Sequence, residues 1–177
     1  LKAAHEIHLR KAEKARQSLK LEKENEDNKH ASFCFDLQKV MSLPCLTTNE
    51  VYYCRQLSVY NLGIHDLKND NAVMNVWHEG TASRGAGEIG SCLLAYCQNL
   101  ANRDITSITA FSDSCGGQNR NIKIALLWMH LTQTTSIELV NHKFMVSGHS
   151  YLPNDADFGI IERAKPKSTE IFVPEQW

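Results

Sequence analysis

The order of the predicted secondary-structure elements constrains the fold of this chain more than any other feature of its sequence. Three runs rich in aromatic and β-branched residues predict consecutive strands at residues 32–40, 51–64 and 72–78. Helix and strand patterns then alternate along the chain. These later elements are a helix over 88–102, a strand over 105–111, a helix over 119–131, a strand over 137–146, a helix over 155–164 and a last short strand over 171–173. The three consecutive strands indicate an antiparallel meander, and the alternation indicates parallel strands joined by helices.

This element order is the one found in the ribonuclease H-like fold, where three antiparallel strands precede alternating helices and parallel strands. We therefore predict a mixed α/β protein with a central mixed five-stranded sheet flanked by helices. The predicted domain covers residues 32–177, because the composition of the chain changes abruptly at residue 32.

Residues 1–31 differ in composition from the rest of the chain. They contain no Gly or Pro, are rich in Lys, Arg, Glu and Ala, and end in a polar run at residues 24–29. This predicts a charged helical arm followed by a linker. Its apolar residues make a poor stripe, so we interpret the arm as solvated, the alternative being that it packs on a partner. The chain begins with Leu1 rather than Met, so we expect a fragment that forms any homo-oligomer through missing flanks or the arm.

Composition limits the classes of function. Among 177 residues, 19 Lys and Arg face 20 Asp and Glu, so a nucleic-acid partner must be held by a local patch rather than by bulk charge. No stretch approaches the roughly 18 uninterrupted apolar residues of a membrane span, so no membrane partner is expected. The six cysteines form no C-x-x-C pair, which indicates reduced thiols inside the cell. A structural zinc site would require distant Cys and His residues to converge.

Three acidic residues lie within or directly after predicted elements of the sheet region. Asp36 lies in an otherwise apolar strand, where an unpaired carboxylate is costly unless a cation or donor compensates it. Asp113 follows the strand over 105–111, and open α/β sheets place ligand sites at the carboxyl ends of their strands. A third carboxylate, from Asp155 or Asp157, comes at the start of a later helix. We expect one cluster that binds two Mg²⁺ or Mn²⁺ ions, because these cations prefer oxygen ligands.

Asp155 and Asp157 are not equivalent candidates for the third metal ligand. Two residues apart on a helix, their side chains point about 200° apart, so only one can face the sheet. Asp155 is expected near the N-cap, where backbone amides would occupy its carboxylate, and we therefore favour Asp157. If the helix begins later, both carboxylates could reach the site from the loop.

Four segments of the chain resemble a largely uncharacterised family of transposon-derived animal proteins, whose core is a ribonuclease H-like domain of the DDE transposase and integrase type. The segments are residues 33–38, residues 55–57 with 60–65, residues 111–119 and residues 148–159. The resemblance covers the chain from Leu1 to Trp177. It implies a metal-dependent nuclease or polynucleotidyl transferase of mobile-element origin. We also expect DNA as the nucleic-acid partner and a nuclear location inside the cell. The resemblance also implies that Asp36 and Asp113 are the first and second acidic residues.

The chain departs from the familiar transposase pattern at the third acidic position. It has the Asp-x-Asp pair of residues 155–157 where that pattern has a single Glu, although Glu162 lies about one helical turn later. Glu88 resembles the additional glutamate of cellular ribonucleases H, but a capping role at the start of its helix is the alternative.

The loop after Asp113 predicts contacts with nucleic acid. Its two glycines permit close approach of a phosphate at the start of the next helix. The donors expected there are Gln118, Asn119 and Arg120. His149 could orient an attacking water or bind a metal ion, the alternative being a hydrogen-bonded structural histidine.

The sequence surroundings argue against two other functions, Cys–His hydrolysis and nucleotide binding by a Walker loop. Cys115 and His149 suggest a nucleophile and a base, but the Cys115 loop joins a strand to a helix, unlike the loop of the all-β trypsin-like proteases. No Walker loop is present either, because no Gly-Lys-Ser/Thr follows the glycines.

Two functions of different classes remain. The first is metal-dependent cleavage or strand transfer on nucleic acid, favoured by the retained acidic residues. The alternative is a domesticated, catalytically inactive module that binds protein or nucleic acid, favoured by the near-neutral charge. A weaker third is hydrolysis of a smaller phosphate ester. The sequence leaves the choice between DNA and RNA open.

Overall fold

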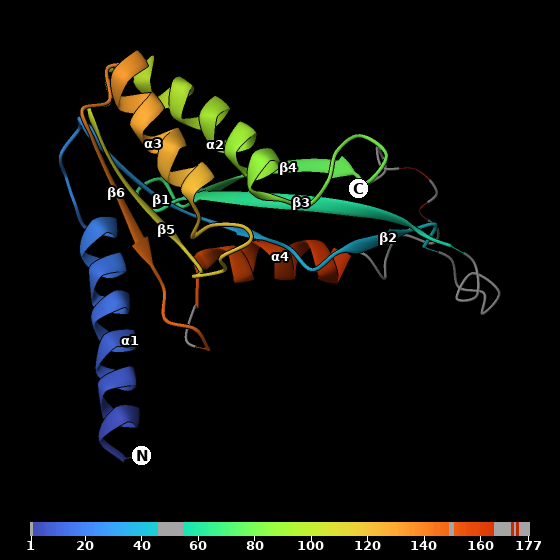
Figure 1. Cartoon of the computed structure of the whole chain (residues 1–177), viewed down its shortest axis with the longest axis horizontal. Helices are drawn as coiled ribbons and strands as arrows, with labels where there is room; N and C mark the ends of the chain where they lie inside the picture. The colour runs from blue at the N-terminus through green and yellow to red at the C-terminus, as the bar shows by residue number, and fades with distance from the viewer. Residues whose placement is uncertain (1, 46–54, 149–150, 165–170, 172, 174–177) are drawn as a thin grey trace.

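The computed structural model describes residues 2–45, 55–148, 151–164, 171 and 173, which form one open mixed sheet of six strands flanked by helices (Figure 1). The strands are β1 (His30–Leu37), β2 (Met41–Leu43), β3 (Leu57–Asp66), β4 (Asn71–His78), β5 (Ser107–Ser112) and β6 (Leu139–Phe144). The helices are α1 (Lys2–Lys23), α2 (Ala86–Ala101), α3 (Ile122–Thr134) and α4 (Pro153–Ala164). The predicted mixed α/β class is confirmed. Within these residues we find no helix with the length and apolar character that a membrane crossing requires.

The strands lie side by side in the order β4, β3, β1, β5 and β6. β2 follows β1 along the same edge of β3. β3 is antiparallel to β1, β2 and β4, whereas β5 is parallel to both β1 and β6. Val59 of β3 pairs with Met41 of β2 on one edge and with His78 of β4 on the other. β1 and β2 therefore share one edge of β3. The predicted count of five strands missed β2, because the regular pairing with β3 stops after Leu37 and resumes at Met41.

Several element boundaries differ from the predicted ones. α3 begins at Ile122 rather than at residue 119, because the side chain of Asn121 caps it by accepting from the Ile124 N–H at 3.2 Å. α4 begins at Pro153, a residue suited to the first helical position. Of the strand predicted over 171–173, Ile171 forms an isolated bridge with Cys45, and residue 172 lies outside the described residues. Residues 51–54 of another predicted strand lie outside the described residues.

The main core lies between the sheet and the pair α2 and α3 (Figure 1). Alternate residues of the central strands point into it, including Phe33 and Phe35 of β1, which are fully buried. α2 contributes the buried residues Ala86, Ile89, Leu93, Cys97 and Leu100. Their helical spacing matches the predicted apolar pattern, so this layer could be recognised from sequence.

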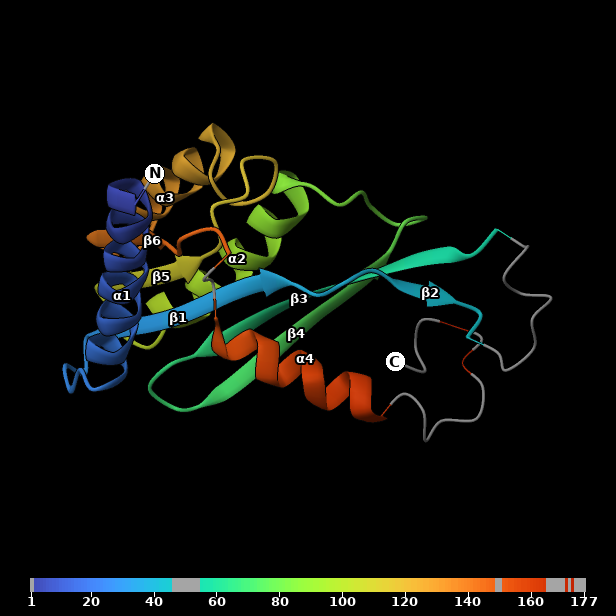
Figure 2. The same cartoon turned by 90° about the horizontal axis from the view of Figure 1, so that it is seen from below.

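α1 and α4 lie against the opposite face of the sheet (Figure 2). A second core forms there from Cys34, Leu67, Phe111, Met145 and Leu152, with Ala15 and Leu19 of α1 packed against it. Ala12 is only 1% exposed. The interpretation of α1 as a solvated arm is therefore wrong, because one side of the helix docks on the sheet through Ala12, Ala15 and Leu19.

Glu22 anchors the end of α1 to the sheet. One carboxylate oxygen accepts from Lys143 Nζ of β6 at 2.8 Å, and the other contacts His30 Nε2 of β1 at 2.8 Å. The Ser32 hydroxyl donates to the main-chain oxygen of Glu22 at 3.1 Å. Burial opposes the charge of Glu22, but the hydrogen bonds from Lys143 and His30 outweigh it and lower the pKa of its carboxyl group.

We expect Glu22→Gln to lower the free energy of unfolding by about 1–2 kcal/mol, because it weakens charge-assisted hydrogen bonds to two partners. Urea denaturation measures the change. Glu13→Gln is the matched control, since Glu13 pairs with Arg16 on the exposed surface of the same helix and should change stability by less than about 0.5 kcal/mol. Equal effects of the two substitutions would contradict the anchoring role.

Candidate functional site

Asp36 and Asp113 lie on the same face of the sheet, at neighbouring positions of adjacent strands. Cys34 of β1 pairs in register with Phe111 of β5, and both side chains belong to the core beneath α1. Asp36 and Asp113 come two residues later on each strand line, so their side chains project from that same face. A shared face is what the predicted cluster of Asp36 and Asp113 requires, and the cluster itself stays a prediction.

Asp36 carries the most perturbed carboxyl group of this face. Burial raises its pKa to about 6, and the N–H of Leu37, which donates to Oδ1 at 2.8 Å, opposes the shift. The negative charges of Asp113 and Asp155 raise the pKa further, while the positive charge of Arg84 lowers it. The charges of Asp113 and Asp155 therefore both act on the carboxyl group of Asp36. Arg84, in the loop between β4 and α2, is a neighbour of the cluster that the sequence motifs did not indicate.

Asp113 is held by the loop that follows β5. Its Oδ1 accepts from the side-chain amide of Asn119 and from the backbone N–H of Cys115, the latter at 3.1 Å. Asn119 is almost fully buried, and its own side-chain oxygen makes no hydrogen bond to any described residue. The loop thus fixes the position of the carboxylate.

The structure separates Asp155 from Asp157. Asp155, in the first turn of α4, accepts from the Leu152 N–H at 3.2 Å, which is the capping contact expected for it. Asp157 is partly buried and contacts Nδ1 of His65 on β3 at 2.8 Å. The argument that Asp157 is the freer carboxylate is therefore wrong, because it did not include the histidine. Asp155 is the one whose charge acts on Asp36.

Gly63 allows α4 to lie directly on β3. It pairs in register with Asp36, and a Cβ atom there would come within 2.8 Å of the Phe158 ring and 3.1 Å of the Asn154 amide. Asn154 is fully buried and donates to the Gly63 carbonyl oxygen at 3.0 Å. Because Gly63 has no side chain, α4 packs closely on β3. The distance of Asp155, which α4 carries, from the sheet depends on this close packing.

The predicted nucleic-acid donors take different positions. Asn119 faces inward and is occupied by Asp113, so it is not a surface donor. The backbone N–H groups of residues 118–120 all donate to the Cys115 carbonyl oxygen, at 2.8–3.3 Å. The Arg120 guanidinium is exposed and lies 5.7 Å from the ring centroid of Phe144, so it remains available to an anion.

The remaining site predictions have mixed outcomes. His149 lies outside the described residues, so its role stays a prediction. Glu88 accepts from the N–H and hydroxyl of Ser83, which makes it a helix cap at the start of α2. The described cysteines are free, and burial raises the pKa of Cys34 and Cys97 to about 12.

No three His, Cys, Asp or Glu side chains come close enough to hold a metal ion in the part of the chain that the structure describes. The donor chemistry nevertheless suits Mg²⁺ or Mn²⁺, because carboxylate oxygens are their preferred ligands. The mutual repulsion at Asp36 is of the kind that a divalent cation relieves.

A buried chain of hydrogen bonds supports the backbone of Asp113. Trp128 Nε1 donates to Nδ1 of His142 at 3.1 Å, so the neutral ring carries its proton on Nε2, which contacts the Ser112 hydroxyl at 2.9 Å. Ser112 in turn donates to the main-chain oxygen of Asp113 at 2.8 Å. Burial lowers the pKa of His142 to about 4. Sequence reasoning missed this network because its members are far apart in the chain.

The stability of the wild type relative to His142→Gln is expected to fall by about 2–3 kcal/mol as the pH drops from 6.5 to 4. Between pH 6.5 and 4 the His142 ring takes up a proton in the unfolded state but stays neutral in the folded state. The raised pKa of Asp36 increases the free energy of unfolding as the pH falls from about 6 to 4. This contribution is common to both proteins, so it cancels in the difference between their stabilities. Urea denaturation at several pH values checks it, with the exposed His130→Gln as control. A flat difference would contradict a buried neutral His142.

Comparisons of the chain with protein-family models, with curated protein sequences and with solved structures find no match. The family resemblance of the four segments therefore stays a prediction. Function has to be argued from the geometry of the site.

Proposed function

We propose that this chain is a ribonuclease H-like domain that cleaves nucleic-acid phosphodiesters, or transfers strands, with divalent metal ions held by Asp36, Asp113 and Asp155. The observation that carries the proposal is the position of Asp36 at one end of the central strands, where burial and the nearby charges of Asp113 and Asp155 raise the pKa of its carboxyl group to about 6. Such perturbed acidic groups are concentrated at functional sites.

The topology of the sheet supports the proposal. Three antiparallel strand lines, β4, β3 and β1, are extended by the parallel strands β5 and β6. Asp36 lies near the end of the central β1, and Asp113 follows the adjacent β5. This is the edge at which open α/β sheets bind ligands.

The residues of the chain have distinct roles in this proposal. Asn119 and the Cys115 N–H orient Asp113, and α4 presents Asp155. Arg84 contributes a positive charge near the cluster, suited to a substrate phosphate. Bound Mg²⁺ or Mn²⁺ ions would activate the attacking water or hydroxyl and stabilise the leaving oxygen. We propose DNA as the substrate and the nucleus as the place where the protein acts.

A second function, a catalytically inactive binding module, is favoured by a specific observation. The described carboxylates form no group of three that could hold a metal ion, and Asp113 and Asp157 are both engaged in internal hydrogen bonds. In such a module the polar cluster would serve the fold alone.

A cleavage assay separates the two functions. The protein is incubated with labelled single-stranded DNA, branched DNA or RNA, in Mn²⁺ or in EDTA. We expect products in Mn²⁺ and none in EDTA. Binding of these nucleic acids without products, together with a melting temperature that Mn²⁺ leaves unchanged, would favour the inactive module.

A further inference from the structure

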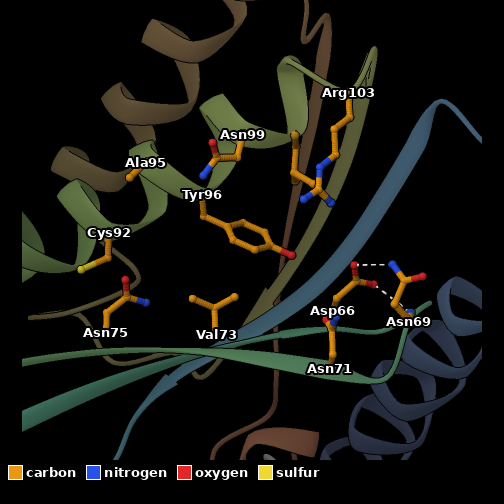
Figure 3. A pocket seen from close by; sticks show the side chains of 11 residues that line it. Asp66, Asn69, Asn71, Val73, Asn75, Cys92, Ala95, Tyr96, Asn99 and Arg103 are labelled. Carbon is orange, nitrogen blue, oxygen red and sulfur yellow. Dashed lines mark hydrogen bonds between the residues drawn. The ribbon is translucent and has the colours of Figure 1, made fainter.

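A pocket of about 240 Å³ lies on the other side of the molecule from the acidic cluster, between β4 and α2 (Figure 3). The ring of Tyr96 crosses its centre, and Val73 lies opposite the ring. Cys92 and Asn75 lie at one end, and Asp66 and Arg103 lie at the other. The volume is below the roughly 300–1,000 Å³ of drug-sized sites, so the ligand must be small.

Polar side chains line this pocket without partners in the protein. Among the described residues, the side chains of Asn71, Asn99 and Arg103 and the hydroxyl of Tyr96 make no hydrogen bond or ion pair. Asn75 uses its Nδ2 on the Leu62 carbonyl oxygen at 3.2 Å, which leaves its side-chain oxygen open. Asn71, Asn99 and Arg103 are exposed, so a ligand that enters the hollow can reach their polar groups directly.

The pocket carries one charge of each sign at the same end. Asp66 caps the turn between β3 and β4, and Oδ2 accepts a single hydrogen bond, from Asn69 at 2.7 Å, so this oxygen can accept another. Burial and the charge of Asp66 raise the pKa of Tyr96, whereas the charge of Arg103 lowers it. Both charges therefore act on the Tyr96 hydroxyl, which points toward their end of the pocket (Figure 3).

We propose that this pocket binds a free α-amino acid with a polar, uncharged side chain. The guanidinium of Arg103 and the hydroxyl of Tyr96 hold the α-carboxylate, and Asp66 holds the α-ammonium group. The side chain extends along the Tyr96 ring and hydrogen-bonds with Asn75 and Asn99. A purely anionic ligand would be repelled by Asp66 and a purely cationic one by Arg103, so the zwitterion fits both charges.

Isothermal titration calorimetry with the full chain tests this site, with L-glutamine as the probe. N-acetyl-L-glutamine lacks the ammonium charge and L-glutamine amide lacks the carboxylate, so each leaves one protein charge unpaired. We expect each analogue to bind at least about tenfold more weakly than L-glutamine. L-leucine should also bind at least about tenfold more weakly, because it leaves the asparagine amides unpaired.

Two variants probe the two ends of the pocket. Arg103→Gln removes the carboxylate partner, and Asn99→Leu removes a side-chain partner on the exposed surface of α2. Both should weaken glutamine binding at least about tenfold. The controls are Arg10→Gln on α1 and Gln98→Leu on α2, which should leave binding unchanged. Circular dichroism confirms that each variant is folded.

The proposal is overturned if L-glutamine gives no binding heat at millimolar concentration. It is also overturned if the two analogues or L-leucine bind as tightly as L-glutamine, or if both pocket variants bind like the wild type. The site does not depend on the proposed nuclease function, because the assay contains neither metal ions nor nucleic acid.

Discussion

Asp155→Asn is expected to lower the rate of Mn²⁺-dependent cleavage by about 100-fold or more, because it removes a carboxylate from the proposed metal site. Loss of an outer-shell partner of a metal ligand alone costs 10–100-fold, and loss of a ligand should cost at least as much. Asn keeps the side-chain oxygen that accepts from the Leu152 N–H, so the helix cap is preserved. The initial rate of product formation at saturating Mn²⁺ measures the effect.

Asp157→Asn is the matched comparison, since it makes the same chemical change two residues later. It removes the charge that faces His65, so it should lower the free energy of unfolding by about 1–3 kcal/mol. Its cleavage rate per folded molecule should fall by less than about tenfold. A rate loss confined to Asp157→Asn would restore Asp157 as the third ligand and contradict the assignment to Asp155.

Gly63→Val is expected to lower the free energy of unfolding by about 3 kcal/mol. The new side chain would overlap the Phe158 ring, and it would crowd the buried Asn154 amide. Because neither neighbour is the free end of a flexible side chain, α4 has to move away from β3. Urea denaturation measures the loss of stability.

Gly87→Ala is the control for the Gly63 substitution, because a Cβ atom at Gly87 meets no atom within 4 Å. Gly87 lies in the first turn of α2, where alanine is a better helix former, so this variant should be as stable as the wild type or slightly more stable. If Gly63→Val unfolds at the wild-type urea concentration, the close packing of α4 on β3 does not hold.

The parts of the fold that could be predicted are those whose signal is local. The apolar spacing of α2 and the aromatic run of β1 each identify an element from a few neighbouring residues, and their order gives the class of the sheet. Asp36 and Asp113 could be paired in advance because both lie at the same end of parallel strands. Their shared face then follows from alternation along each strand.

The parts that could not be predicted depend on partners far away in the sequence. α1 docks through Ala12 and Ala15, which make no apolar stripe, and through a carboxylate whose partner is on β6. The pairing of Asp157 with His65 joins residues 92 positions apart. Capping arguments consider only the backbone amides next to a residue. They therefore predicted that the Asp157 carboxylate is unpaired, whereas it contacts His65.

The anchoring of α1 also has a consequence for synthesis on the ribosome. Glu22 and Lys143 are 121 positions apart, and at about 5–20 residues per second the ribosome needs roughly 6–24 s to add the intervening chain. During that time α1 and β1 are already made, but β6 does not yet exist. The contacts of Glu22 with His30 and Ser32 can therefore form early, whereas its ion pair with Lys143 forms only after β6 has emerged.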